Sequence, residues 1–188
     1  MAIGAGFDDV LAAAQAGAPW ALQRLYEDLA PVVTGYLRLR GAPEPDDTAS
    51  EAFLAVFRTL GSFAGDEAGF RSWVFTIVHH RLIDDRRRRG RRPVTEPLGD
   101  SVVQAGGDVE AEALAALSGG WVAAALEVLS DEQREVMLLR IVADLSVDEV
   151  ATIVGKRAGA VRALQHRGLE RLRRQLADQR VTSRNREE

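Results

Sequence analysis

Apolar positions recur along most of the chain at the three- and four-residue intervals of an α-helix. In the first half they predict four helices, at 7–16, at 19–41, at about 46–60 and at about 70–88. Short runs rich in glycine, proline or acidic residues separate these helices, as expected for connecting turns.

Two capping boxes predict helix starts in the second half. Ser130-Asp131-Glu132-Gln133 and Ser146-Val147-Asp148-Glu149 each place a serine three residues before a Gln or Glu that can bond back to the backbone. Gly155 then ends the second helix, and a last helix begins near Ala158. We expect helices from about 109 to 177 and a polar, frayed tail after Gln179.

The stretch 93–108 has two prolines, three glycines and no aromatic residue, which predicts a flexible linker. The chain is therefore expected to be all-α, with two small helical domains at 1–92 and 109–180 and a polar tail at 181–188. A length of 188 residues, 46% of them hydrophobic, is enough for two small cores.

Composition excludes several classes of protein. The chain has no cysteine, so it has no disulfides and no thiolate metal sites. No run approaches the roughly 18 apolar residues of a membrane span, and the N-terminus lacks a basic, signal-like region. These features predict a cytoplasmic protein without membrane insertion.

The net charge of −4 conceals two basic regions. Seven arginines lie between Arg81 and Arg92, and ten basic residues lie between Lys156 and Arg186. Two basic regions on an otherwise acidic chain favour two separate contacts with a polyanion. Solvated helix faces are the alternative.

The second basic region follows a short capped helix and a tight turn, which is a helix-turn-helix signature. In such a motif the second helix enters the DNA major groove, and its first residues reach base edges. Val161 and Leu164 are predicted to face the core. The candidate DNA-contacting residues are then Lys156, Arg157, Arg162, Ala163, His166 and Arg167. A helical hairpin with a solvated basic face is the alternative.

The helix at 70–88 carries the first basic region. At about 100° per residue its predicted buried stripe is Phe70, Trp73, Val74, Ile77, Val78 and Arg81. The opposite side then holds Phe75, Thr76, His79, Ile83 and Arg86. Exposed rings beside arginines are typical of a surface that stacks single-stranded bases, although Phe75 can instead pack against the preceding loop.

Histidines and aspartates on this helix raise the alternative of a metal-dependent hydrolase. His80 and Asp84 are four residues apart and share a face, with His79 and Asp85 beside them. No further ligand group follows in the sequence, and the adjacent arginines repel a cation and pair with the aspartates. This weighs against a metal site.

Three segments together resemble the extracytoplasmic-function (ECF) class of bacterial sigma factors. They are Phe70 to Ile77 with Asp84 and the arginine run, Leu129 to Val136, and Leu145 to Ala151. The likeness extends from about Phe7 to Leu176. It implies a factor that brings core RNA polymerase to promoter DNA, has no cofactor and no catalytic residue, and is commonly held inactive by an anti-sigma factor.

The resemblance also implies a role for each candidate residue. Core-polymerase binding falls to Asp46, Asp47, Glu51, Phe53 and Phe57. Recognition and melting of the −10 element falls to Phe63, Trp73, Phe75, Thr76, His79, His80, Arg86 and Arg87. The helix-turn-helix residues named above are implied to read the −35 element.

The chain departs from the family pattern at three places. Thr48-Ala49-Ser50 precede Glu51 where aliphatics and a glutamine are usual, His80 stands where some members have asparagine, and Ala64 often corresponds to arginine. A stand-alone helix-turn-helix regulator is the main alternative function. It differs from a sigma factor in binding duplex DNA tightly without polymerase.

Overall fold

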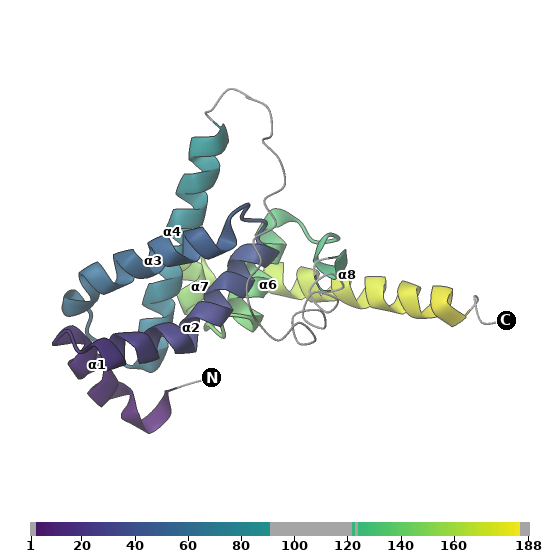
Figure 1. The fold of residues 1–188 in the computed structure, drawn as a ribbon. Helices are drawn as coiled ribbons and strands as arrows, with labels where there is room; N and C mark the ends of the chain where they lie inside the picture. The colour runs from purple at the N-terminus through teal and green to yellow at the C-terminus, as the bar shows by residue number, and fades with distance from the viewer. Residues whose placement is uncertain (1–2, 91–121, 123, 185–188) are drawn as a thin grey trace.

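The computed structural model describes residues 3–90, 122 and 124–184, and no strand occurs among them. The first half forms α1 (Phe7–Gln15), α2 (Pro19–Leu39), α3 (Pro45–Thr59) and α4 (Glu67–Gly90), and the second forms α6 (Asp131–Ile141), α7 (Val147–Ile153) and α8 (Ala158–Arg184). Short 3₁₀ turns lie at Gly4–Gly6 and Leu60–Ser62. The all-α prediction is confirmed, and we call residues 3–90 the N-terminal bundle and residues 122 and 124–184 the C-terminal bundle (Figure 1).

The N-terminal bundle packs α3 and α4 against α2, with α1 against the start of α2. Prolines occupy the first turn of α2 and α3, where the missing N–H costs nothing because it has no intrahelical partner. Many of the buried side chains from these helices are aliphatic and follow the predicted helical spacing; they include Leu25, Leu29, Val33, Leu37, Ala52, Val56, Val74 and Val78.

Side-chain to backbone hydrogen bonds fix the start of α4. Asp66 Oδ1 accepts from the Gly69 N–H at 2.8 Å and so caps the first turn. The Glu67 carboxylate accepts from the backbone N–H groups of Ile3 and Gly4 at 2.5 and 3.0 Å, which ties the N-terminal turn to α4.

Both predicted capping boxes are present. The Ser130 and Ser146 hydroxyls accept from the N–H groups of Gln133 and Glu149 at 3.3 and 3.2 Å, and each longer side chain bonds back. Gly155 has φ +64°, a left-handed conformation that makes the tight turn between α7 and α8.

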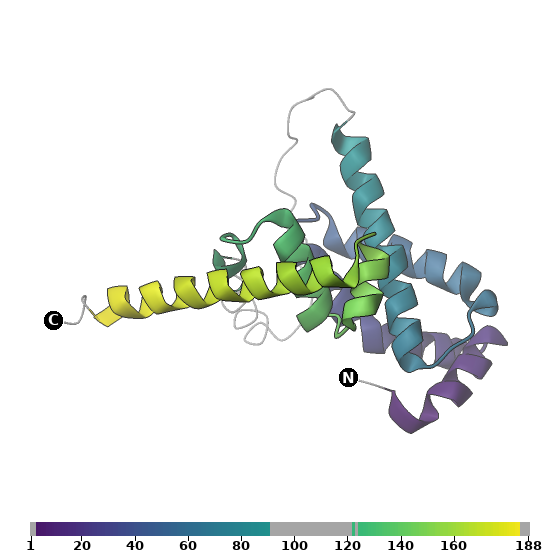
Figure 2. The same cartoon turned by 180° about the vertical axis from the view of Figure 1, so that it is seen from behind.

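The helix α8 is longer than predicted. It runs on to Arg184, past Gln179, after which the tail was expected to fray, and its last turns project beyond the other helices (Figures 1 and 2). The predicted linker at 93–108, and the predicted beginning of the second helical block at 109, lie outside the described residues.

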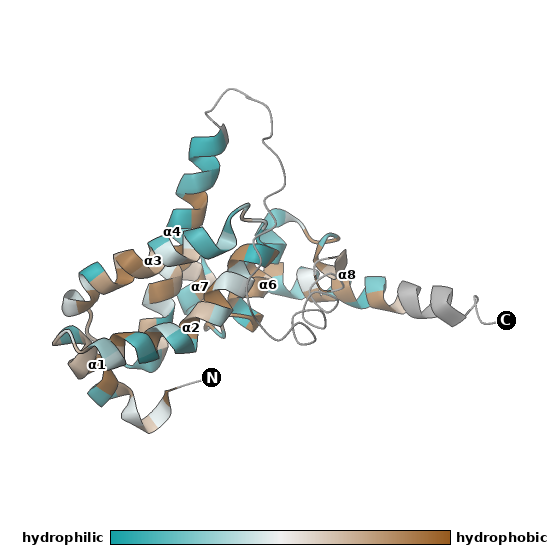
Figure 3. Cartoon of the chain, viewed as in Figure 1, coloured by the Kyte–Doolittle hydropathy of each residue, from teal (hydrophilic) through white to brown (hydrophobic). Residues whose placement is uncertain are grey.

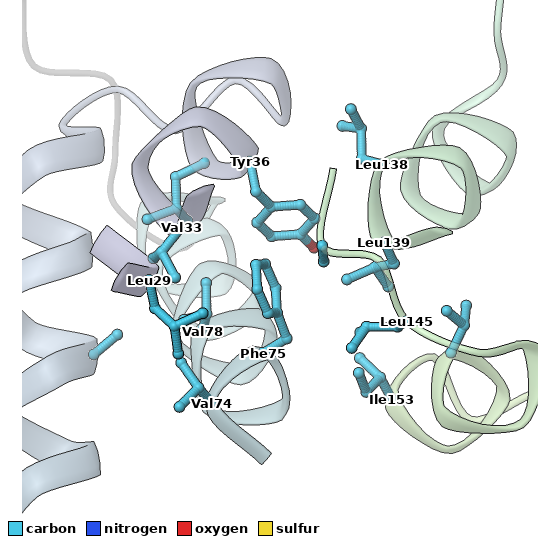
Figure 4. Close-up of a cluster of buried hydrophobic side chains, with 14 of the residues drawn as sticks. Leu29, Val33, Tyr36, Val74, Phe75, Val78, Leu138, Leu139, Leu145 and Ile153 are labelled. Carbon is cyan, nitrogen blue, oxygen red and sulfur yellow. The ribbon is translucent and has the colours of Figure 1, made fainter. Parts of the chain in front are cut away.

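The two bundles pack against each other. α6 contacts α2, and α7 contacts α4. Figure 4 shows Tyr36 and Phe75 of the N-terminal bundle directed toward Leu139 and Leu145 of the C-terminal bundle. All four side chains are at most 1% exposed, so the apolar core is continuous between the bundles.

Candidate nucleic-acid interface

The helix-turn-helix consists of α7 and α8. Its apolar residues Val150, Ile153, Val161 and Leu164 are buried, as predicted for Val161 and Leu164. Arg140 on α6 contacts both sides of the motif: it donates to the Leu145 carbonyl just before α7 and, at 3.4 Å, to Gln165 Oε1 on α8.

Four of the six predicted base-reading residues are exposed at the start of α8. Arg157, Arg162, His166 and Arg167 are solvent-exposed, whereas Lys156 and Ala163 are half-buried. Within the described ranges, no ion pair engages these three arginines. Their guanidinium groups can therefore donate to an anion or a base edge without first breaking a protein contact.

Two of the candidates do have acidic neighbours. Lys156 Nζ lies 2.6 Å from Glu132 Oε1, so this ion pair connects the turn between α7 and α8 to α6. His166 Nε2 lies 3.5 Å from Glu170 Oε1, one turn further along α8. Lys156 thus stabilises the helix-turn-helix through this ion pair and also places a basic group at its edge.

The structure corrects the predicted orientation of α4. The predicted stripe is buried at Phe70, Val74 and Val78. Phe75 was expected on the solvent face, but it is completely buried, 5.5 Å from the Tyr36 ring in an edge-to-face contact. His79, also expected to be exposed, is only 7% exposed.

Two different neighbours explain why both sides of α4 are buried. The stripe side packs on α2 and α3, and the side bearing Phe75 and His79 faces the C-terminal bundle (Figure 4). Of the other −10 candidates on α4, His80, Arg86 and Arg87 are exposed, and Thr76 and Trp73 are half-buried. The hydrophilic end of α4 is visible in Figure 3.

The loop before α4 presents an aromatic cluster. Phe63 is half-buried, with ring centroids 5.4 Å from Phe70 and 5.1 Å from Trp73. Gln15 holds this loop by donating to the carbonyls of Leu60 and Phe63 at 3.0 and 2.8 Å. Gly65 lies beneath Phe63, since a Cβ there would be 3.1 Å from the ring.

The acidic candidates on α3 are accessible. Asp46, Asp47 and Glu51 are exposed, and Phe57 is half-buried. Phe53 is buried at 3% exposure with its ring 4.8 Å from that of Tyr26, so it supports the bundle from inside. Three further apolar side chains, which the sequence pattern did not single out, are exposed on α2 and α3: Trp20, Tyr26 and Leu54.

A polar cluster links the two bundles beside the apolar contact. Arg40, just after α2, donates to the Asp131 carbonyl and to Glu135 Oε1, both at 3.2 Å. His79 Nδ1 lies 3.1 Å from the same Glu135 oxygen. We call Arg40, His79 and Glu135 the inter-bundle cluster.

Burial perturbs the groups in and around the inter-bundle cluster. Burial raises the pKa of Glu135, but contact with His79 and the charge of Arg40 outweigh it, so the pKa lies below its ordinary value. Burial also raises the pKa of Tyr36, whose hydroxyl has no hydrogen-bond partner among the described residues. Glu135 is therefore a carboxylate at neutral pH, held between two basic side chains.

Arg40 and Glu135 were not predicted as functional residues. One signal was available for Arg40: it continues the buried stripe of Val33, Tyr36 and Leu37, where a charged residue needs a partner. Nothing in the spacing identifies Glu135 as that partner, because the two residues are 95 positions apart in sequence.

The histidines and aspartates considered for a metal site do not gather around one point. Across residues 3–90, 122 and 124–184, no three His, Cys, Asp or Glu side chains are grouped to hold a metal ion. Asp84 lies 3.8 Å from Arg87, and Asp85 lies 3.1 Å from Arg89. In the same residues no helix is long and apolar enough to span a membrane.

Comparison with known families matches both bundles. Sigma-70 region 2 matches residues 25–92, and sigma-70 region 4 matches residues 125–174. The fold and the basic helix-turn-helix therefore define a sigma-70-type protein.

Individual relatives and solved structures extend these matches. The ECF RNA polymerase sigma factor SigD of Mycobacterium tuberculosis (strain ATCC 25618 / H37Rv) is 35% identical over 177 residues, or 90% of this chain and 84% of SigD. The structure of CnrH in complex with the cytosolic domain of CnrY has a TM-score of 0.66 at 23% identity, covering 92% of this chain and 98% of CnrH. The sigma factor RpoE, in complex with the anti-sigma factor NepR from Bartonella quintana, has a TM-score of 0.58 at 22% identity, with coverage of 82% and 95%.

This chain belongs to the ECF family of RNA polymerase sigma factors. It directs RNA polymerase to promoters for transcription initiation, as the sequence predicted.

Proposed function

We propose that residues 1–92 bind core polymerase and open the −10 element, and that residues 109–180 read the −35 element. The segment 93–108 joins them in this scheme. Support comes from the order of the two matched regions and from a basic surface in each bundle. Two tethered contacts on one promoter also gain affinity from each other.

The observation that carries the −35 assignment is the exposed basic start of α8. Arg157, Arg162, His166 and Arg167 face solvent, while Val161 and Leu164 anchor the helix from beneath. An arginine can bridge guanine O6 and N7 in the major groove or hold a phosphate. We assign −35 reading to these residues, with Lys156 and Ala163 beside them.

For the −10 element we assign α4 and the loop before it. His80, Arg86 and Arg87 are accessible for phosphates or bases, and the half-buried Phe63 and Trp73 offer aromatic rings. Capturing a base from the duplex costs a few kcal/mol of unstacking, which such contacts offset. Phe75, Thr76 and His79 complete the set inferred from the family.

For core-polymerase binding we assign the surface of α3. Asp46, Asp47 and Glu51 present acidic groups, and the half-buried Phe57 lies beside them. Acidic side chains beside apolar surface suit a basic partner surface. The buried Phe53 contributes by holding α3 in place.

In this scheme the polymerase does the chemistry and the chain supplies no catalytic group. We assign it to the cytoplasm, where core polymerase and promoters are. We also propose that an anti-sigma factor restrains it, by likeness to RpoE, which was solved with NepR. Adding such a partner to a transcription reaction is expected to stop initiation by this chain.

Run-off transcription tests the proposal. Core polymerase with this chain is expected to start RNA at a defined set of sites in genomic template, and core alone is not. Electrophoretic mobility shifts of duplex DNA, with and without core polymerase, distinguish a sigma factor from a stand-alone helix-turn-helix regulator. Tight, sequence-specific binding of duplex DNA by the chain without core, combined with no polymerase association, would establish the regulator instead.

A further inference from the structure

The C-terminal bundle covers the side of α4 that carries Phe75 and His79. Both belong to the −10 set assigned above, and both are inaccessible in this arrangement, with Phe75 at 0% and His79 at 7% exposure. The covering side chains include Leu139 and Leu145 (Figure 4). DNA cannot reach this side of α4 while the bundles are in contact.

The contact is specified by charge as well as by apolar packing. Arg40 is 4% exposed, and its guanidinium meets Glu135 Oε1 and the Asp131 carbonyl, both at 3.2 Å. His79 reaches the same carboxylate oxygen at 3.1 Å. Removing one partner of a buried ion pair leaves an uncompensated charge, so each member depends on the others.

Glu135 contacts residues at two different helices of the N-terminal bundle. Glu135 comes from α6, Arg40 from the end of α2 and His79 from α4. Arg86, also on α4, donates to the Arg40 carbonyl and so holds the end of α2 in position. Glu135 is thus the group of the C-terminal bundle on which the polar part of the contact centres.

We propose that this structure is a closed, self-inhibited state of the sigma factor. The inter-bundle cluster holds the C-terminal bundle over the −10 side of α4, and the bundles must separate before promoter melting. This inference rests on the proposed assignment of α4 to the −10 element. The partner that opens the chain is one that binds a separated bundle more tightly than the closed pair, as polymerase with promoter does.

The absence of cysteine permits a direct test in the full chain. Cysteines introduced at Asp9 on α1 and Arg174 on α8, both exposed, take a donor and an acceptor dye. Single-molecule energy transfer then reports the separation of the bundles. We expect one dominant narrow population in the free wild-type chain and a second, broader one when core polymerase and promoter DNA are added.

The diagnostic variant is Glu135→Gln, which keeps the side-chain size and removes the charge. It should lower the ratio of closed to open molecules by at least about tenfold, because Arg40 then lacks its counter-ion. The matched control is Glu132→Gln, three residues earlier on α6. Glu132 is exposed and pairs with Lys156 inside the same bundle, so this change should leave the ratio unaltered. Circular dichroism checks that each variant keeps its helices.

Two outcomes overturn the closed state as proposed. A broad distribution in the free wild-type chain means that the bundles do not close. A folded Glu135→Gln chain with the wild-type distribution means that the inter-bundle cluster does not hold them.

Run-off transcription tests the consequence. With limiting chain, Glu135→Gln is expected to reach half-maximal RNA at a concentration at least about threefold below wild type, with the same maximum. A shifted energy-transfer distribution with no change in this concentration overturns the inhibitory role. Normal closure in a chain that never supports initiation contradicts the proposed function instead.

Discussion

We expect Arg162 and Arg167 to contact DNA, because each is exposed on a helix anchored by Val161 and Leu164 and has no ion pair among the described residues. Arg162→Ala should weaken binding of the holoenzyme to duplex promoters by roughly five- to hundredfold, if the side chain makes a bidentate base contact worth about 1–3 kcal/mol. Binding of the chain to core polymerase should not change. Titration of labelled promoter with holoenzyme measures the effect.

The control for that change is Arg24→Ala, which removes an exposed arginine from α2, outside the helix-turn-helix. It should leave promoter affinity within error of wild type. Equal losses from the two substitutions would mean that overall charge, and not the position of Arg162, sets the affinity.

Phe75 now has a structural role that its predicted exposure did not suggest. Truncating a fully buried phenylalanine costs about 3–5 kcal/mol, so Phe75→Ala should destabilise the N-terminal bundle by that amount in urea titrations. Trp20→Ala is the comparison, since Trp20 is 59% exposed and a surface change costs about 0.5 kcal/mol or less. Similar midpoints for both variants would contradict the burial of Phe75.

Among the helices, the capping boxes are the clearest case of a start encoded locally. Ser146→Ala removes the acceptor for the Glu149 N–H and should cost about 1 kcal/mol of stability. Ser50→Ala is matched to it: the Ser50 hydroxyl donates to the Asp46 carbonyl within α3, a bond that stabilises a helix little, so the change should be near neutral. Chemical denaturation measures the free energy of unfolding of both variants. Equal values for the two would contradict the capping role of Ser146.

Local signals predicted most of the helices well. Prolines, serine caps and Gly155 gave the starts of α2, α7 and α8 to within a residue, because these signals act over one turn. The predicted end of α8 was wrong, because the polar residues after Gln179 continue the helix without an apolar stripe that would reveal it. Periodicity thus defines where a helix packs better than where it stops.

The error on α4 has a different origin. Periodicity correctly placed Phe70, Val74 and Val78 on one buried side. It does not tell how many sides of a helix are covered, because the second neighbour of α4 comes from residues more than fifty positions later in the chain. For the same reason the sequence indicates single candidate residues but not the contact between Arg40 and Glu135, which are 95 positions apart.

Closure of the two bundles should depend on pH through Glu135. Burial raises the pKa of Glu135, but His79 and the charges of Arg40 and Arg86 lower it by more, so the pKa lies below the ordinary 4.5. A lowered pKa means that Glu135 favours closure fully above pH 4.5 and that this contribution is lost as pH falls through the folded value. Energy transfer in the doubly labelled chain should report more open molecules at that acid step.

The Glu135→Gln chain provides the control for the pH titration. Without the carboxylate, the acid step in the energy-transfer signal should vanish while the global unfolding signal in circular dichroism persists. An unchanged step in this variant would assign the acid sensitivity to other groups.

Promoter binding by the complete holoenzyme should be strongly salt-dependent, because each phosphate contact releases condensed counter-ions. If Arg167 contacts a phosphate, Arg167→Ala should reduce the slope of log affinity against log salt by about one. A plot over several chloride concentrations gives this slope. A weaker affinity with an unchanged slope would instead assign Arg167 to a base.

The carboxylate at position 135 also sets how sensitive the cell's response is to the amount of this protein. If about 1% of molecules are open, the concentration of binding-competent factor is about a hundredfold below its total concentration, and the first 1.4 kcal/mol taken from closure raises the open fraction about tenfold. Substitutions here would retune the threshold at which a regulon switches on while leaving its promoter sequences untouched. The concentration threshold for initiation can therefore evolve independently of promoter specificity.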